Sequence, residues 1–179
     1  TVARCLVYDP TAQAVFIDCQ VSLSPHRLHQ LLDRFQGERL GSGDKSFILK
    51  RLHCYQPTCF EELTRVLMRL WWFPLENLRL LVIDSIGTPL RAHSLTDFSQ
   101  WQMAIRQTGL CLRRLAHRQA LSIMTSNHLN AKGEPLLGDT WAQFIDRRVI
   151  LRWRSGQRLC AIPNEKDANP YEISLPGIV

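Results

Sequence analysis

The residues with the clearest potential for chemistry stand where apolar runs end. The stretch LRLLVID, residues 78–84, is aliphatic up to Asp84, and Ser85 follows it. A carboxylate at the end of a buried strand is costly unless a cation or a hydrogen-bond donor meets it. Two interpretations fit. Asp84 either holds Mg²⁺ through water beside a nucleotide, as a Walker B aspartate does, or it accepts hydrogen bonds in a turn that Ser85 and Gly87 favour.

Two more polar residues close apolar runs in the same manner. Asp18 ends AVFID, residues 14–18, and Asn127 ends ALSIMTSN, residues 120–127. In parallel sheets covered by helices, ligands bind at the carboxyl ends of the strands. We therefore expect Asp18, Asp84 and Asn127 to lie at one edge of one sheet.

The elements that must position these residues alternate along the chain. Helical spacing of apolar residues predicts helices over residues 1–8, 22–36, 58–72 and 101–119. Apolar runs predict strands over residues 14–18, 47–55, 78–84 and 120–127. Residues 37–46 and 128–140 read as loops, 147–153 and 157–162 as an antiparallel hairpin, and 171–178 as a last short strand. Ser24 is the expected N-cap of the second helix, with Pro25 in its first turn.

This alternation is typical of an α/β protein, with a mainly parallel central sheet between two layers of helices and an antiparallel C-terminal hairpin. No repeat and no linker divides the chain, so residues 1–179 are expected to form one domain with a sizeable core. The apolar fraction of 45% and the charged fraction of 21% are ordinary for a folded protein.

Composition also bears on the compartment. No segment reaches the roughly eighteen uninterrupted apolar residues that a membrane helix needs, and the start TVARCLVYDP lacks the features of a signal peptide. A start at Thr1, without methionine, suggests a processed, truncated or partly ordered chain. The six cysteines lie far apart without a CxxC pair, which favours buried free thiols in a reducing compartment. An unforeseen disulfide is the alternative, and we assign no metal.

Arginine dominates the basic residues. The net charge is +6, and eighteen of the 22 basic residues are arginines, which bind phosphate and carboxylate groups in a bidentate manner. Such an excess favours a nucleic acid or an acidic protein as partner. The densest groups are Arg113, Arg114 and Arg118 in the last predicted helix and Arg147, Arg148, Arg152, Arg154 and Arg158 in the hairpin. Each group either binds a polyanion or covers an ordinary solvated surface. Arg152 and Arg154 would share one face of their strand, opposite Leu151 and Trp153.

Tryptophans offer two further candidates. Trp71 and Trp72 are adjacent, so both cannot face one core, and one of them is expected at a partner surface. Trp101 either stacks on an exposed base or anchors the long helix in the core.

Four segments, in this order, carry a resemblance to a known family. They are FIDCQVSLSPHRLHQLL (16–32), LLVIDSIGTPLR (80–91), LSIMTSNHLN (121–130) and LGDTWAQFIDRRVILRW (137–153). Together they resemble the RecA-type recombinase core, closest to the eukaryotic strand-exchange recombinase and its paralogues, from about residue 14 to residue 179. The resemblance implies a RecA-like three-layer α/β/α fold.

The resemblance also implies roles for single residues. Asp84, followed by Ser85, would be the Walker B aspartate. Gln20 falls where the family has the glutamate that activates the attacking water. His128 falls where it has the glutamine that senses the γ-phosphate. Residues 92–101 match the first DNA loop, which Arg91 precedes, and 128–137 match the second, which contains Lys132. Pro170 lies in the region that caps a neighbour's nucleotide.

The departures from the family matter equally. The chain has no phosphate loop of the form G-x-x-x-x-G-K-[ST]. The stretch GSGDKS, residues 41–46, has Asp44 in place of the second glycine and is expected to be a surface loop. Thr1 fits the last residue of a phosphate loop upstream, because TVARCLVY matches the helix that follows one. Gln20 is a further departure, since an amide orients water but does not take its proton at neutral pH.

We therefore expect a non-catalytic or weakly catalytic recombinase paralogue of homologous-recombination DNA repair. It would act in the nucleus as an assembly subunit, in a hetero-oligomer with other paralogues, and support the strand-exchange recombinase on single-stranded DNA. Arg91, Lys132, Arg152 and Arg154 are the candidate DNA contacts, and Trp71, Trp72 and Arg147 the candidate partner contacts. The alternatives are an active DNA-dependent ATPase whose phosphate loop lies upstream, with ATP and Mg²⁺ as cofactors, and a RecA-fold NTPase outside recombination.

Overall fold

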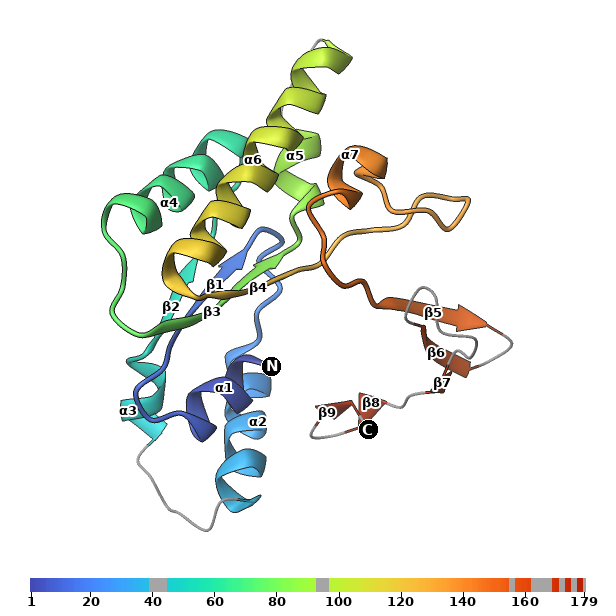
Figure 1. Ribbon diagram of the computed structural model, residues 1–179. Helices are drawn as coiled ribbons and strands as arrows, with labels where there is room; N and C mark the ends of the chain where they lie inside the picture. The colour runs from blue at the N-terminus through green and yellow to red at the C-terminus, as the bar shows by residue number, and fades with distance from the viewer. Residues whose placement is uncertain are drawn as a thin grey trace.

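A four-stranded parallel sheet lies at the centre of the fold, with its strands in the order β2–β1–β3–β4 (Figure 1). These strands are β1 (Gln13–Asp18), β2 (Leu52–Tyr55), β3 (Leu78–Asp84) and β4 (Ser122–Thr125). The computed structural model describes residues 1–38, 45–92, 97–154, 157–161, 169–170, 173–174 and 177–178. Each pairing within this sheet is parallel, as the alternation of helices and strands predicted.

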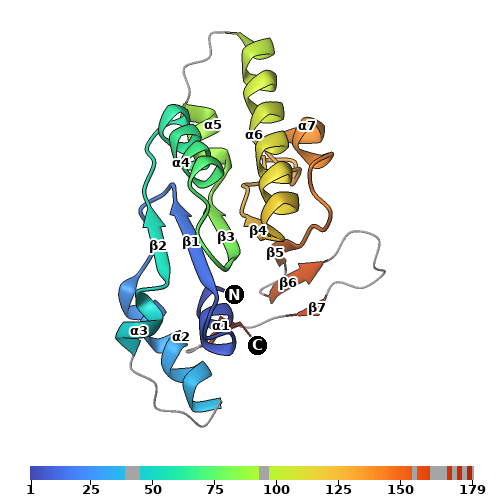
Figure 2. The same cartoon turned by 60° about the vertical axis from the view of Figure 1, so that its left-hand side comes forward.

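Helices cover both faces of the sheet (Figures 1 and 2). One face packs against α1 (Val2–Tyr8), α2 (Pro25–Glu38) and α3 (Lys45–Leu49) through Ala14, Leu80 and Val82. The other packs against α4 (Phe60–Trp72), α5 (Gly87–Ala92), α6 (Phe98–Gln119) and α7 (Gly138–Ala142) through Val15, Ile17, Leu81 and Ile83. Successive strand residues point to opposite faces, which gives the two clusters. The predicted α/β class with a mainly parallel central sheet is confirmed.

β3 runs through the middle of both clusters. Leu78 and the four residues 80–83 are buried. Of the six residues of β3 that precede Asp84, only Arg79 is exposed. A parallel strand covered on both faces reads as a continuous apolar run, which is what the sequence shows at this place. Each such side chain contributes about 1.5–3 kcal/mol through its burial. This burial fixes where the strand ends and therefore where Asp84 lies.

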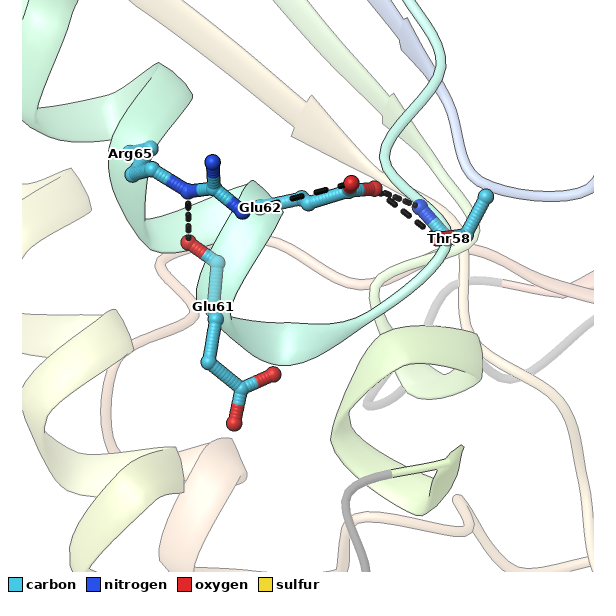
Figure 3. A network of polar contacts seen from close by, with 4 residues as sticks. All are labelled: Thr58, Glu61, Glu62 and Arg65. Carbon is cyan, nitrogen blue, oxygen red and sulfur yellow. Dashed lines mark hydrogen bonds and ion pairs between the residues drawn. The ribbon is translucent and has the colours of Figure 1, made fainter.

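The first turns of α2 and α4 are held by polar side chains. The amide N–H of Arg27 donates to Ser24 Oγ at 3.2 Å, so Ser24 caps α2 as predicted. At the start of α4, Glu62 Oε2 accepts from the N–H of Thr58 at 2.7 Å and from its hydroxyl at 2.9 Å (Figure 3). Arg65 Nε donates to the carbonyl oxygen of Glu61 at 3.4 Å in the same network. The helix that leads to Trp71 and Trp72 therefore has a well-defined beginning.

The long helix α6 is fixed at both ends and near its middle. Asp97 accepts from the N–H of Ser99 at 3.0 Å, and Ala120 ends the helix in the left-handed region, at φ 48°. Near the middle, Gly109 faces the ring of Phe144: a Cβ at residue 109 would lie 2.3 Å from Phe144 Cδ2. The chain segment after α7 therefore approaches α6 as closely as it does only because residue 109 is glycine.

One predicted strand is half wrong. Residues 47–55 were expected to be extended throughout, but Lys45–Leu49 form α3 and only Leu52–Tyr55 form β2. Ile48 is buried from this short helix against the α1 and α2 side of the core. The Arg51 guanidinium then donates to the carbonyl oxygens of Leu6, Asp9 and Ala12, at 2.7, 2.9 and 2.8 Å. These contacts with α1 and the following turn favour a helix and a turn before the strand, and no local pattern encodes them.

Two short helices were also missed. Ser85 and Gly87 favoured a turn, yet α5 runs from Gly87 to Ala92, and its Pro89 lies in the first helical turn, where proline is tolerated. The stretch 128–140 was read as a loop, but α7 begins within it at Gly138 and buries Trp141 in the core.

The C-terminal part forms small antiparallel sheets apart from the central one (Figures 1 and 2). The predicted hairpin is confirmed, with β5 (Ile150–Arg154) paired with β6 (Gln157–Ala161), and β7 (Asn169–Pro170) joins it. The last predicted strand is instead two short strands, β8 (Ile173–Ser174) and β9 (Gly177–Ile178), paired with each other. Within the described ranges, no helix has both the length and the apolar character needed to span a membrane.

Candidate functional site

Polar residues gather at the carboxyl ends of β1, β3 and β4, as predicted. β1 and β3 pair so that Asp18 is the register partner of Asp84. The N–H of Cys19 donates to the carbonyl oxygen of Asp84 at 2.7 Å, and the N–H of Ser126 donates to that of Ile83 at 3.0 Å. The main chain thus holds the ends of the three strands at one edge of the sheet.

Asp18 is fully engaged in holding its own turn. It is buried, and its carboxylate accepts from the N–H groups of Gln20, Ser22 and Leu23 at 3.3, 3.0 and 2.8 Å. Burial alone would raise the pKa of Asp18, but these hydrogen bonds outweigh it, so the pKa lies below its ordinary value. Asp18 is therefore an anionic support for the segment that carries Gln20.

Asp84 is half-buried, and its carboxylate accepts a hydrogen bond from the hydroxyl of Ser126. The sequence interpretation missed Ser126, although a hydroxyl just beyond the neighbouring strand was a usable signal. In the second interpretation of Asp84, its carboxylate accepts hydrogen bonds from the turn that contains Ser85 and Gly87. The donor to this carboxylate is instead Ser126, which follows β4. The hydroxyl of Ser85 lies instead 2.9 Å from Thr88 Oγ1. The peptide bond between Asp84 and Ser85 is cis.

Three of the predicted site residues come together in one cluster. Gln20 Nε2 lies 2.7 Å from His128 Nε2 and donates to Thr88 Oγ1 at 3.2 Å. Ser85 Oγ lies 3.2 Å from His128 Nε2. Gln20, Ser85 and His128 thus share contacts, while Asp84 bonds separately to Ser126. Thr88 is the member that sequence reasoning missed, because α5 was not expected.

Asn127, the third predicted strand-end residue, turns inward. Its side-chain Nδ2 and Oδ1 are buried and have no hydrogen-bond partner among the described residues. A Cβ at Gly87 would lie 2.9 Å from Asn127 Oδ1, so the amide fits closely against the start of α5. Asn127 therefore lies at the predicted edge of the sheet, and its side-chain amide packs against the main chain at the start of α5.

A cavity of about 360 Å³ opens beside Asp84 on the α1 and α2 side of the sheet. Its lining is largely apolar, and its polar part includes Thr1, Ser22, Ser24, Arg27, Asp84 and Ser126. The cavity joins the start of α1 to the end of β3, which are the two places that a nucleotide site of the resembled family would join.

The residues present fit one half of a site for Mg²⁺ and a nucleotide. A carboxylate beside serine hydroxyls is a donor set that suits a hydrated Mg²⁺, with Asp84 as its anionic member. For the phosphate half, the described residues that line the cavity include no glycine-rich loop and no lysine. Among the described residues, no three His, Cys, Asp or Glu side chains gather into a metal-ligand cluster.

The candidate DNA residues lie on separate elements. Arg91 is exposed on α5, and its Nε donates to the carbonyl oxygen of Gly87 at 3.4 Å. Lys132 is exposed in a turn in which its N–H donates to Asn130 Oδ1 at 2.9 Å. Arg152 and Arg154 belong to β5, but their side chains lie outside the described part. The predicted basic face of the hairpin therefore stays a prediction.

The tryptophans divide as expected. Trp71 packs against the core, with the Arg118 guanidinium 4.6 Å from its ring centroid, whereas Trp72 is 67% exposed. Trp101 packs against the core and donates from Nε1 to the carbonyl oxygen of Leu90 at 3.1 Å, so it anchors α6. Arg147, the third candidate partner contact, is exposed.

The cysteines were expected to be buried. All six are free, but only Cys19 is buried, and Cys54 is exposed. Burial, together with the charges of Asp18 and Asp84, raises the pKa of Cys19 to about 12.

The fold and the strand-end cluster together agree with one class of protein, the RecA-like α/β proteins. A mainly parallel sheet between helices, with acidic and hydroxyl residues at its carboxyl edge, is consistent with the RecA-like fold. No protein-family model matches the chain. The chain is similar to the DNA repair protein RAD51 homolog 3 of Dictyostelium discoideum, with 26% identity over 151 residues. The match covers 73% of this chain but 38% of that protein, so the chain spans well under half of its relative's length.

Proposed function

We propose that this chain is part of a recombinase paralogue that acts in homologous-recombination DNA repair without hydrolysing ATP appreciably. The relative named above is a DNA repair protein, and this similarity supports a role in DNA repair for this chain. The contact of Gln20 with His128 and Thr88 supports the other part of the proposal, that the chain does not hydrolyse ATP appreciably. At the place where the resembled family has a base, this chain has an amide held by neighbours, and an amide does not take a proton from water at neutral pH.

The proposed role is that of an assembly subunit in the nucleus. In a hetero-oligomer with other recombinase paralogues it would support the strand-exchange recombinase on single-stranded DNA. The exposed Trp72 and Arg147 support a partner surface, since tryptophan and arginine are enriched in interfaces. DNA would be held through Arg91, Lys132, Arg152 and Arg154, in contacts to phosphate.

The test of the catalytic half is ATP turnover by the full-length protein with single-stranded DNA. Wild type and Asp84→Ala should both remain near the background rate. Gln20→Glu is the matched gain-of-function variant, because it restores a carboxylate without changing side-chain length. A DNA-stimulated turnover comparable to that of an ordinary recombinase, abolished by Asp84→Ala, would refute the proposal.

One observation favours an active DNA-dependent ATPase instead. The cavity beside Asp84 reaches Thr1, so a phosphate loop upstream of Thr1 would place bound ATP and Mg²⁺ near this carboxylate. Equilibrium binding of a fluorescent ATP analogue to the full-length protein separates the cases. Binding without turnover supports the assembly subunit, whereas binding with turnover supports the ATPase.

The test of the assembly half is co-expression with candidate paralogues. We expect the wild-type chain to gain solubility and melting temperature with its partner, and Trp72→Ala to lose most of that gain while keeping its own fold. A monodisperse monomer whose melting temperature no candidate partner raises would contradict the proposal.

A further inference from the structure

The outer side of α6 carries positive charge that nothing on the helix balances. From Phe98 to Gln119 the helix contains the four arginines Arg106, Arg113, Arg114 and Arg118 and no aspartate or glutamate. All four are exposed. In both views α6 runs along the outside of the molecule next to α4, and its N-terminal turns extend beyond the neighbouring helices (Figures 1 and 2).

Among the described residues, only part of this charge has a partner. Arg113 lies 3.6 Å from Asp146, and Arg118 donates to the carbonyl oxygen of Trp71 at 3.0 Å. For Arg106 and Arg114, the described part of the chain offers no ion pair and no hydrogen bond. Two guanidinium groups on one helix therefore remain available for an external anion.

Apolar side chains are exposed on the same side. Met103 is 58% exposed and Leu110 is 47% exposed. At roughly 100° per residue, Met103, Arg106, Leu110 and Arg114 lie within about 80° of one another around the helix. We call these four residues the α6 stripe. It alternates apolar and basic side chains over three turns, with an unpaired arginine beside each apolar residue.

We propose that the α6 stripe binds an acidic amphipathic helix of a partner protein. Apolar side chains of that helix would contact Met103 and Leu110, and its carboxylates would pair with Arg106 and Arg114. Methionine and arginine are both enriched in protein interfaces, and arginine pairs with carboxylates through parallel hydrogen bonds. This inference does not depend on recombination or on the state of the nucleotide site.

Charge and composition favour a protein helix over two other occupants. A single strand of nucleic acid gains from aromatic side chains on which bases stack, and the stripe has none. Met103 and Leu110 would gain nothing from a phosphate backbone. A second copy of this chain is disfavoured by its net charge of +6.

The experiment measures binding of a fluorescently labelled helical peptide to the full-length protein by anisotropy. The peptide has leucine at the positions that face the stripe and glutamate on either side of them. We expect the double variant Arg106→Glu, Arg114→Glu to weaken binding more than tenfold, and Leu110→Gln to weaken it at least threefold. Arg4→Glu is the matched control, because Arg4 is an exposed helical arginine on α1, across the sheet, and it should leave the affinity within twofold of wild type.

Four outcomes would overturn the proposal. The peptide fails to bind, or Arg4→Glu weakens it as much as the double variant does. A single-stranded oligonucleotide of equal charge displaces the peptide through Arg106 and Arg114 while Leu110→Gln has no effect, which would make the face a nucleic-acid surface. Finally, the protein alone sediments as a dimer that Leu110→Gln dissociates, which would assign the face to a second copy. Circular dichroism and melting temperature of each variant establish that it is folded.

Discussion

Gln20 and His128 are 108 residues apart in the chain, and their side-chain Nε2 atoms lie 2.7 Å apart. The contact joins the segment after β1 to the segment after β4, across the end of β3. Ser85 and Thr88 complete it, so the side chains of Gln20, Ser85, Thr88 and His128 form one set of polar groups in contact with one another.

We expect the Gln20 and His128 side chains to be energetically coupled. In a double-mutant cycle of Gln20→Ala and His128→Ala, the two losses of unfolding free energy should fail to add, by about 0.5–1 kcal/mol. Both residues are exposed, which keeps the expected coupling small. Chemical denaturation with urea measures it. Strict additivity would show that the two side chains do not interact in solution.

Asp18 should contribute to stability in a pH-dependent manner. Its pKa is lowered in the folded protein, so its contribution is complete above the unfolded value near 3.9 and is lost as the pH falls through the folded value. We expect Asp18→Asn to cost about 2–3 kcal/mol at pH 7, because three N–H groups lose a charged acceptor. The difference from wild type should shrink below about pH 4.

The control for Asp18 is Asp33→Asn, since Asp33 is an exposed helical carboxylate paired with Lys45. It should change stability by less than about 0.5 kcal/mol at pH 7. Urea unfolding of the three proteins from pH 7 to pH 3 tests both expectations. An Asp18→Asn cost that stays constant over this range would contradict the assignment.

Alanine at Gly109 should be destabilising even though alanine favours a helix. The added Cβ would meet the Phe144 ring at 2.3 Å, and such overpacking costs about 1–3 kcal/mol. Gly37→Ala is the matched control: Gly37 is also helical but has open space around it, so it should gain up to about 1 kcal/mol. Adding Phe144→Ala should remove the steric part of the Gly109→Ala cost. Thermal melts that rank the two glycine variants equally would refute this packing.

Cys19 and Cys54 should differ widely in reactivity. With a pKa of about 12, the Cys19 thiol is almost wholly protonated at pH 8, and it is also buried, whereas Cys54 is exposed. Brief alkylation of the folded protein should label Cys54 well before Cys19, and denaturant should make both reactive. Mass spectrometry of the digested protein identifies the labelled sites. Early labelling of Cys19 would show that the end of β1 opens readily.

DNA affinity, where it is measured, should fall steeply with salt and depend little on sequence, because arginine contacts to phosphate carry it. Charge reversal at Arg152 and Arg154 should weaken binding by at least tenfold. If these substitutions change nothing while Arg91→Ala abolishes binding, the loop beside α5 holds the DNA and the hairpin does not.

Local patterns determined most of the framework. The apolar run 78–84 predicted a buried central strand, Ser24 predicted the start of α2, and the adjacent Trp71 and Trp72 predicted that one of them is exposed. These inferences succeeded because each depends on neighbours within one turn or one strand, where spacing alone dictates which side chains share a face. The positions of Asp18, Asp84 and Asn127 at one edge followed in turn from the parallel order of strands.

Only the tertiary structure decided which residues these side chains contact. Ser126 meets Asp84, Thr88 meets Gln20, and Phe144 lies against Gly109, in each case because packing brings together segments that are remote in sequence. The same reason explains α3, where Arg51 and the buried Ile48 draw a predicted strand into a helix and a turn beside α1. Sequence spacing determines which face a side chain occupies, but the contact that it makes there depends on the element packed against that face.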